Sequence, residues 1–228
     1  MQKQVVAIIL AAGDGRRMAA EEKKQFLALR GISVLERAVG AFCESSMISS
    51  LIVVLSKEDI PRAQATLSRF TKPISFVVGG KTRAESARLG FAAACDADFV
   101  AFHDAARCLI TQRDLERVIC TAIEHGAATA ATKITDTVKE TDSEASIKRT
   151  VPRDNLWAAS TPQVFAYADY ERAIASFSAD VTDDNMLLER IGASVRCVET
   201  LDENIKITTQ RDIAYAEYVL SLREGRNV

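Results

Sequence analysis

Four apolar runs, each followed by a helical stretch, constrain the fold of this chain more than any other feature. Val5–Leu10 is apolar at every position rather than at alternate positions, and similar runs return at residues 51–55, 74–78 and 99–102. Strands that are covered on both faces have this pattern, and they occur mainly in parallel sheets. The sequence therefore predicts an α/β fold built on a doubly wound, mostly parallel sheet.

Helices are expected between and after these strands. The expected helices are residues 34–44, 61–70, 83–94, 114–124, 169–176 and 183–191. Two further strands are expected at 195–198 and 205–207, and Thr209 can cap a last helix that ends near Leu222. No repeat, low-complexity tract or linker is visible, so we expect a single domain over residues 1–228.

Residues 133–157 interrupt the alternation of strand and helix. This stretch is rich in Thr, Asp, Lys and Arg and has no helical stripe, but residues 137–138 and 150–151 are β-type. We expect a β-hairpin arm at about 134–157 that projects from the domain. An insertion of this length in a compact domain is usually either functional or disordered, and both interpretations stay open.

Composition and charge exclude several classes of protein. The chain has 48% hydrophobic and 26% charged residues, which is typical of a soluble globular protein and not of a disordered one. Its 29 basic and 31 acidic residues leave a net charge of -2, so we expect no nucleic-acid partner and only local anion sites.

We expect a cytoplasmic protein without a membrane partner. The longest apolar run, residues 5–12, is far shorter than the roughly 20 residues of a membrane span, and no export signal is visible. The five cysteines are odd in number and none forms a C-x-x-C pair, which argues against a disulfide framework or a zinc knuckle.

A glycine turn with basic residues follows the first strand. The sequence there is Ala11-Ala-Gly-Asp-Gly-Arg-Arg-Met18, and Lys23-Lys24 comes soon after. Glycines at the carboxyl end of a strand let backbone N–H groups approach an anion, and the cations suit a polyphosphate. The simpler alternative is a tight turn beside a solvated basic face.

Two known phosphate loops do not match this turn. No Gly-Lys-Ser/Thr follows, so it is not a Walker A loop. Met18 stands where the dinucleotide fingerprint has its third glycine, and Glu36, at the spacing of a ribose-binding acid, falls in a predicted helix. These departures disfavour a dehydrogenase.

Candidate binding residues also follow the third and fourth apolar runs. The fourth run ends in His103-Asp-Ala-Ala-Arg107, where Asp104 is suited to Mg²⁺ held together with phosphate oxygens, or alternatively to capping the next helix. Gly79-Gly80 precedes another helix and can present backbone N–H groups to a base or an anion. We expect His103 and His125 to be structural.

These motifs, in this order, resemble the 2-C-methyl-D-erythritol 4-phosphate cytidylyltransferases of the non-mevalonate isoprenoid pathway. The matching segments are Leu10-Ala-Ala-Gly-Asp-Gly-Arg-Arg-Met18, Lys24-Gln-Phe-Leu27, Val34-Leu-Glu36, Gly79-Gly80 with Arg83 and Ser86, His103–Arg107, Asp136-Thr-Val-Lys139, Thr150-Val-Pro-Arg153 with Leu156-Trp157, Thr161-Pro-Gln163, Thr182-Asp-Asp184, and Asn204-Ile-Lys-Ile-Thr208 with Asp212.

The resemblance implies a Rossmann-like nucleotidyltransferase fold and a homodimer with shared active sites, formed through the arm. It implies that CTP and methylerythritol phosphate give the CDP-alcohol and pyrophosphate, with Mg²⁺ as cofactor. The implied catalytic residues are Arg17 and Lys24. The implied CTP-binding residues are Ala11, Ala12, Gly13, Asp14, Gly15, Gly80, Ser86 and Asp104, of which Asp104 also holds the metal. The implied acceptor-binding residues are Arg107, Asp136, Thr137, Arg153 and Lys206.

The chain departs from the family pattern at three positions. Lys23 stands where a proline usually precedes the catalytic lysine, which leaves open whether Lys23 shares the role of Lys24. Cys108 replaces a usual proline after Arg107, and Pro152 stands where an aspartate is common before the arm arginine.

Two other functions remain open at this point. Ribitol 5-phosphate cytidylyltransferases share these motifs, although the Leu-Ala-Ala-Gly turn and Leu156-Trp157 favour methylerythritol phosphate. A non-catalytic, nucleotide-binding regulatory protein could share the fold, but the presence of Arg17, Lys24, Asp104, Arg107 and Lys206 argues against it.

Overall fold

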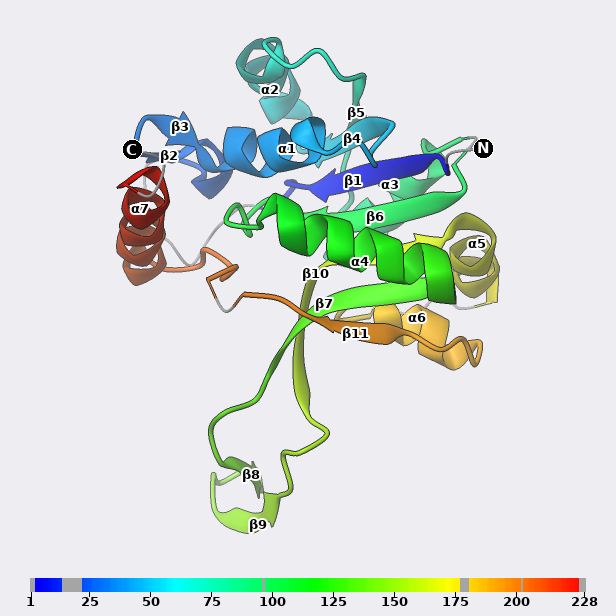
Figure 1. Ribbon diagram of the computed structural model, residues 1–228, viewed down its shortest axis with the longest axis vertical. Helices are drawn as coiled ribbons and strands as arrows, with labels where there is room; N and C mark the ends of the chain where they lie inside the picture. Colours follow the sequence, from blue (N-terminus) through cyan, green and yellow to red (C-terminus); the bar gives the residue numbers. More distant parts are fainter. Residues whose placement is uncertain (1–2, 14–21, 96, 177–180, 202, 226–228) are drawn as a thin grey trace.

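One sheet organises the body of the molecule (Figure 1). The computed structural model describes residues 3–13, 22–95, 97–176, 181–201 and 203–225. Within them, a seven-stranded sheet has the order β11-β7-β10-β6-β1-β4-β5. Its strands are β1 (Val5–Leu10), β4 (Ser50–Leu55), β5 (Ile74–Val78), β6 (Phe99–Asp104), β7 (Ala127–Lys133), β10 (Trp157–Ala166) and β11 (Arg196–Glu199).

The sheet is mostly parallel, as predicted. β1 pairs in parallel with both β4 and β6, while β10 runs antiparallel to its neighbours β6 and β7. The chain leaves β1 toward β4 on one side and later returns to β6 on the other side, so the strand order reverses next to β1. Ligands of doubly wound sheets bind at such a point.

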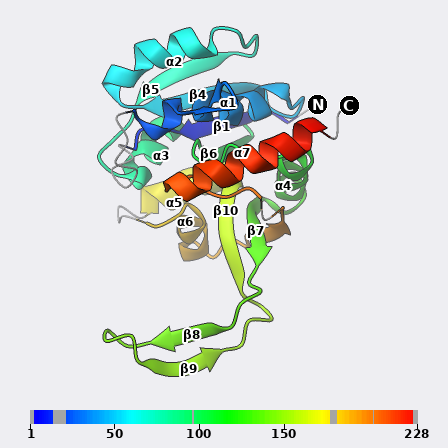
Figure 2. The same ribbon diagram turned by 90° about the vertical axis from the view of Figure 1, so that its left-hand side faces the viewer.

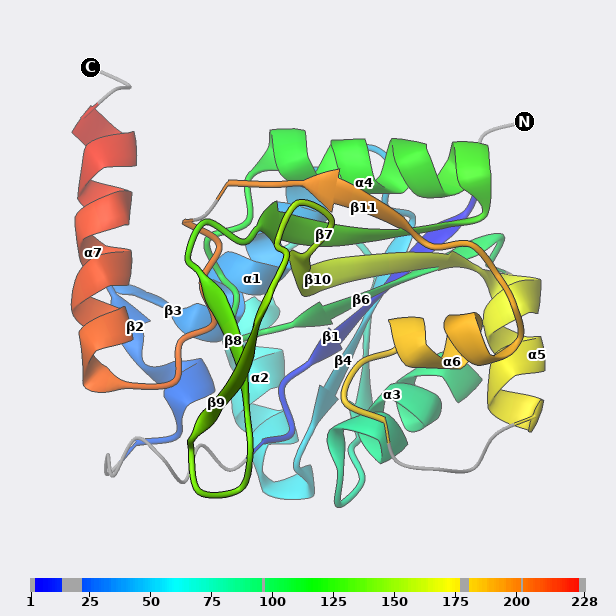
Figure 3. The same cartoon turned by 90° about the horizontal axis from the view of Figure 1, so that it is seen from below.

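Helices cover both faces of the sheet. They are α1 (Val34–Glu44), α2 (Ile60–Leu67), α3 (Arg83–Ala92), α4 (Gln112–His125), α5 (Tyr167–Ser176), α6 (Asn185–Arg190) and α7 (Gln210–Gly225). Buried side chains of α1, α2, α4 and α7 form one core, and those of α3, α5 and α6 form the other. Figure 3 shows α4 on the opposite side of the sheet from α3 and α6. Among the described helices, none has both the length and the apolar character that a membrane crossing requires.

Local signals explain where two of these helices begin. Ser33 and Glu36 form a capping box at α1, in which the Ser33 hydroxyl accepts from the Glu36 N–H at 3.1 Å. Thr111 accepts from the Asp114 N–H at the start of α4, also at 3.1 Å. The predicted bounds of β1, β5 and α1 agree with the structure.

The sequence prediction was wrong or incomplete at two places. Residues 205–207 form no strand, because the N–H of Ile207 donates to the carbonyl of Ala106, in the loop after β6, rather than to a sheet edge. Strands β7 and β10 were not predicted. Four of the seven residues in β7 are alanines, which carry little strand propensity, so tertiary packing decides their conformation.

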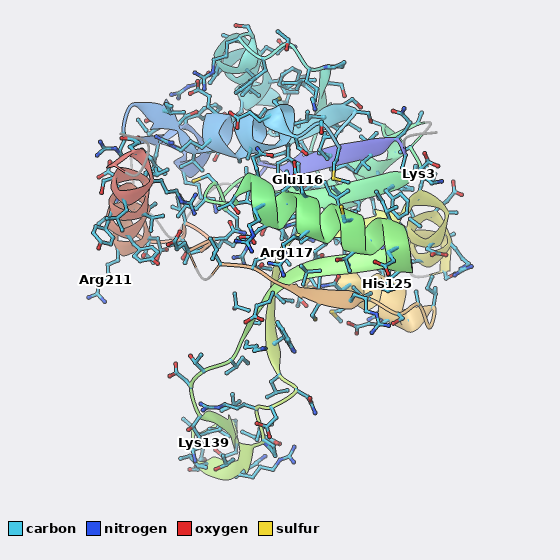
Figure 4. The ribbon with its side chains drawn as sticks, viewed as in Figure 1. Lys3, Glu116, Arg117, His125, Lys139 and Arg211 are labelled. Carbon is cyan, nitrogen blue, oxygen red and sulfur yellow. The ribbon has the colours of Figure 1, made fainter. Side chains whose placement is uncertain are left out.

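A hairpin projects from the body between β7 and β10 (Figure 2). Its strands β8 (Val138–Thr141) and β9 (Ile147–Val151) pair antiparallel to each other. No residue from 134 to 157 is buried within this single chain, and Ile147 is 65% exposed. Figure 4 shows Lys139 on this arm, far from the helix that carries Glu116 and Arg117.

Candidate active site

A pocket lies at the carboxyl ends of β1 and β6, beside the loop that follows β5. It is lined among others by residues that the sequence analysis had singled out: Ala11, Ala12, Gly13, Lys24, Gly80, Ser86, Asp104 and Lys206. The parallel register brings Leu10 opposite Asp104, so the two strand ends open into the same space. The topology therefore gathers side chains that are more than 190 positions apart in sequence, such as Ala12 and Lys206.

Asp104 carries the buried negative charge of this pocket. Its Oδ1 accepts from Arg83 Nε at 3.2 Å, and its Oδ2 accepts from Lys206 Nζ at 2.7 Å. Burial alone would raise the pKa of Asp104, but the charges of Arg83 and Lys206 outweigh it and hold the pKa at about 2. The carboxylate is therefore ionised at neutral pH and flanked by two cations.

Arg83 links this carboxylate to a second one. Its Nη1 donates to Asp184 Oδ2 at 2.7 Å, and the Tyr170 hydroxyl donates to Asp184 Oδ1 at 2.8 Å. The Asp184 side chain is 1% exposed. Burial alone would lower the pKa of Arg83, but the negative charges of Asp184 and Asp104 outweigh burial and raise it. Burial, followed by the charge of Asp184, raises the pKa of Tyr170 well above its ordinary value.

His103 organises the loop that follows β6 and has a structural role. The Thr161 hydroxyl accepts from the Asp104 N–H and lies 3.1 Å from His103 Nδ1, while His103 Nε2 lies 3.1 Å from the Arg107 carbonyl. Because the Arg107 carbonyl can only accept, the proton is assigned to Nε2, and Nδ1 accepts from the Thr161 hydroxyl. Burial lowers the pKa of His103 to about 4, so the ring is neutral.

The glycine pair after β5 packs tightly against the first loop. A Cβ on Gly79 would lie 2.5 Å from the Cβ of Ala12, so only glycine allows this approach. The N–H of Gly80 donates to Ser86 Oγ at 3.1 Å, and the N–H of Lys81 donates to Glu85 at 2.7 Å. In this structure these N–H groups therefore bond to side chains of α3.

Lys23 and Lys24 have different surroundings. Lys24 lines the pocket. Lys23 directs its ammonium to Asp59, with Nζ 2.8 Å from Oδ2, and to the Ser56 hydroxyl at 3.1 Å. The sequence left open whether Lys23 shares the role of Lys24, and the structure pairs Lys23 with Asp59 while Lys24 lines the pocket.

The remaining candidates lie elsewhere. Asp136, Thr137 and Arg153 are exposed on the arm and do not line the pocket, and Arg153 bonds to the carbonyl of Thr135. Arg107 lies next to the pocket, where its Nη1 donates to the Asn204 carbonyl at 2.9 Å and its Nε is buried with no hydrogen-bond partner. Predicted residues Asp14, Gly15 and Arg17 lie outside the described residues.

Sequence reasoning gave no role to Arg83, Asp184 or Tyr170. Arg83 and Asp184 both stood in motifs that matched the family, and that was the available signal. Their pairing could not be read from the sequence because 101 positions separate them.

The donor set near Asp104 fits magnesium held mainly by substrate. Within the described part of the chain, no group of three or more His, Cys, Asp or Glu side chains is placed to hold a metal ion. Mg²⁺ commonly uses only one or two protein carboxylates and takes its other ligands from phosphates and water. Asp104, ionised on the pocket wall with its oxygens accepting from Arg83 and Lys206, can supply one such carboxylate.

Fold and pocket together define an α/β protein with a pocket lined by Lys24, Arg83 and Lys206 at the switch point of a doubly wound sheet, where such folds bind their ligands. The family model described as "IspD: 2-C-methyl-D-erythritol 4-phosphate cytidylyltransferase" matches residues 5–222, and the chain belongs to this family.

Relatives match over almost the full length of this chain. The 2-C-methyl-D-erythritol 4-phosphate cytidylyltransferase of Synechococcus sp. (strain CC9902) is 41% identical, with 95% of this chain and 97% of that protein covered. That of Pelotomaculum thermopropionicum is 36% identical and covers 98% of this chain and 97% of its own length. The crystal structure of 4-diphosphocytidyl-2C-methyl-D-erythritol synthase from Anaerococcus prevotii superimposes with a TM-score of 0.84 at 32% identity, covering 97% of this chain and 100% of that one.

Proposed function

We propose that this protein is a cytidylyltransferase that joins CTP to 2-C-methyl-D-erythritol 4-phosphate, giving 4-diphosphocytidyl-2-C-methyl-D-erythritol and pyrophosphate for isoprenoid precursor synthesis. The observation that carries the proposal is the pocket at the ends of β1 and β6, where Lys24, Lys206 and the Arg83–Asp104 pair meet in a chain of this family. The acceptor phosphate oxygen attacks the α-phosphorus of CTP in line, and pyrophosphate leaves.

The main physical difficulty of this reaction is charge. One anion attacks another, and negative charge grows on the equatorial and leaving oxygens, so preorganised cations supply most of the rate acceleration. We assign Lys24 to the phosphates of CTP because it lines the pocket. Arg17 is proposed as its partner by family resemblance, together with the backbone of Gly13, Asp14 and Gly15.

Asp104 is proposed to hold Mg²⁺ against the CTP phosphates. Its ionised state and its place on the pocket wall support this role. When bound, Mg²⁺ would neutralise phosphate charge and make the α-phosphorus more electrophilic. Arg83 and Lys206 keep the carboxylate in place and ionised.

The nucleoside end of CTP is proposed to lie against Ala11, Ala12, Gly80 and Ser86. These residues line the pocket, and the close approach of Gly79 to Ala12 brings the two loops together. The small side chains on both loops suit a flat base and a ribose.

The acceptor is proposed to bind between Lys206 and Arg107 of one chain and the arm of a second chain. Asp136, Thr137 and Arg153 are exposed and do not line the pocket of their own chain, so they are available to a neighbour. An isolated two-stranded hairpin is only marginally stable in water, which favours a partner surface for the arm. We therefore propose a homodimer whose two active sites are shared.

The setting proposed for the enzyme is the cytoplasm. The five cysteines are free, which suits a reducing compartment. A net charge of -2 and a local anion pocket favour small phosphorylated substrates over nucleic acid or membrane partners.

Pyrophosphate release from CTP and Mg²⁺ tests this function, with methylerythritol phosphate and ribitol 5-phosphate compared as acceptors. Release with methylerythritol phosphate alone is the expected result. Release with ribitol 5-phosphate alone would keep the chemistry and change the substrate. No pyrophosphate release with either acceptor, in folded protein that still binds CTP, would favour the non-catalytic regulatory alternative.

A further inference from the structure

Two side chains that flank Lys24 converge on one carboxylate oxygen. Asp59 Oδ2 accepts from Lys23 Nζ at 2.8 Å and from Gln25 Nε2 at 3.1 Å. The same oxygen accepts from the Ser56 hydroxyl at 2.8 Å. Lys23, Lys24 and Gln25 are consecutive, so both chain neighbours of Lys24 are tied to a single atom of another element.

That atom belongs to a well-anchored part of the fold. Asp59 ends the short 3-10 helix Lys57–Asp59, which follows strand β4, and it is 8% exposed. The residue ahead of this helix, Ser56, also bonds to Asp59 and fixes its rotamer. A nearly buried carboxylate without these donors would be strongly unfavourable, so the contacts are held rather than incidental.

The segment that carries Lys24 is a short turn with a second point of support at its other end. Lys24–Phe26 is a single 3-10 turn, closed by the Phe26 N–H donating to the Lys23 carbonyl at 2.9 Å. Phe26 is buried beneath the Arg62 guanidinium, whose carbon lies 4.2 Å from the ring centroid. Asp59 therefore holds the N-terminal half of a turn whose C-terminal half is held by Phe26.

We propose that Asp59 is a positioning residue for Lys24. By holding Lys23 and Gln25, it fixes the turn from which Lys24 lines the pocket. The inference rests on the proposed function, since it takes Lys24 to act on the phosphates of CTP. In this account Lys23 serves as an anchor and does not contact the substrate.

A positioning role predicts a particular kinetic signature. A cation displaced by about 1 Å from developing charge loses most of its effect on the transition state, whereas binding of a flexible triphosphate tolerates such a shift. Loss of the anchor should therefore lower kcat much more than it raises the KM for CTP.

The first experiment compares Asp59→Asn with the control Glu58→Gln, which removes the exposed carboxylate next to it on the same turn. We expect Asp59→Asn to lower kcat about tenfold with the KM for CTP changed less than about twofold, and Glu58→Gln to match the wild type. In a Lys24→Ala background, Asp59→Asn should lower kcat by less than about twofold, because the positioned group is gone. An unchanged kcat in the single variant, or an undiminished loss in the double variant, would overturn the proposal.

A second pair of variants separates anchoring from a direct effect of the Lys23 charge. Lys23 has φ −63° and ψ 134°, which is the backbone conformation that proline imposes at φ. Lys23→Pro removes the charge but restrains the backbone, while Lys23→Met only removes the charge. Anchoring predicts that the Pro variant keeps a kcat several times higher than the Met variant. Equal losses in both variants would indicate that the Lys23 charge acts on the substrate and would contradict the proposal.

Amide hydrogen exchange tests the anchor without any turnover. We expect Asp59→Asn, and not Glu58→Gln, to speed exchange at the Phe26 and Leu27 amides, which close the turn by bonding to the Lys23 and Lys24 carbonyls. If wild-type protein releases no pyrophosphate, the proposed function fails, and this exchange still decides the anchor. Unchanged protection in Asp59→Asn would overturn it.

Discussion

The pocket and the arm use charged residues in opposite ways. Arg83 and Asp104 line the pocket and form an ion pair, and Arg83 also pairs with Asp184, whose side chain is only 1% exposed. On the arm, the ion pair between Arg149 and Glu140 is 68% and 45% exposed, and no residue is buried.

This difference indicates which part of the proposed site is formed within a single chain. Buried, mutually bonded charges are fixed in direction before any substrate arrives, and exposed pairs contribute little to stability or geometry. The Arg83 network beside the pocket is thus fixed within one chain, whereas the charged arm residues are exposed in that chain.

The largest expected effect comes from breaking the buried network. Arg83→Met leaves Asp104 and Asp184 without their shared guanidinium, so we expect the free energy of unfolding to fall by about 3–5 kcal/mol. Urea denaturation at neutral pH measures it, with Arg149→Met on the arm as the matched control. If the two variants proved equally stable, the contrast between pocket and arm would be lost.

A pH titration sharpens the same contrast. His103 has a folded-state pKa of about 4 against an ordinary value of 6.5, so between these values the unfolded chain binds a proton that the folded chain does not. The contribution of His103 to the free energy of unfolding should therefore fall as the pH drops from about 6.5 to about 4, by at most about 3 kcal/mol.

Denaturation in buffer containing EDTA, from about pH 7 to about pH 4.5, measures this slope. His103→Gln should flatten it, and His125→Gln, at the exposed end of α4, should leave it as in the wild type. An identical slope in the His103 variant would show that the buried ring does not contribute.

Removing a pocket cation tests the proposed chemistry. Lys24→Ala should lower kcat by about 10²-fold, equivalent to about 2.7 kcal/mol, while the protein folds normally, because its charge acts mainly in the transition state. Arg17→Ala is expected to behave alike. Pyrophosphate release gives the rates, and exposed Lys57→Ala is the control. Near-normal turnover in both Lys24→Ala and Arg17→Ala would refute the proposed site.

The smallest effect is expected on the arm. Arg153→Ala should raise the KM for the acceptor about tenfold and leave the KM for CTP nearly unchanged, because one charged contact to phosphate is lost. Lys148→Ala, also exposed on the arm, should change neither constant. A larger increase in the KM for CTP than in the KM for the acceptor would contradict the assignment of Arg153 to the acceptor.

The sequence predicted the elements whose pattern is local. The apolar run of residues 5–10 and the helical stretch of residues 34–44 predicted β1 and α1, and the bounds of both were confirmed. The alanines of β7 carry no such pattern, and residues 205–207 resemble a strand but bond to the loop after β6. In both cases tertiary contacts decide the conformation.

The candidate site shows the same limit. That Ala12, Gly80 and Asp104 would meet could be predicted, because the carboxyl ends of parallel strands share one edge. The contact between Lys23 and Asp59 spans 36 positions and joins two short turns, so no local sequence pattern predicts it. That Lys23 pairs with Asp59 while Lys24 lines the pocket could be seen only in the structure.

The most direct test of a site shared between two chains is complementation in mixed dimers. Lys24→Ala and Arg153→Ala proteins, each poorly active alone, are unfolded together, refolded as a mixture, and assayed for pyrophosphate release at low acceptor concentration. If the arm of one chain completes the pocket of the other, each mixed dimer has one intact site, and random pairing restores about a quarter of wild-type activity. If each chain builds its own site, the mixture shows no more than the average of the two variants, which would contradict the account.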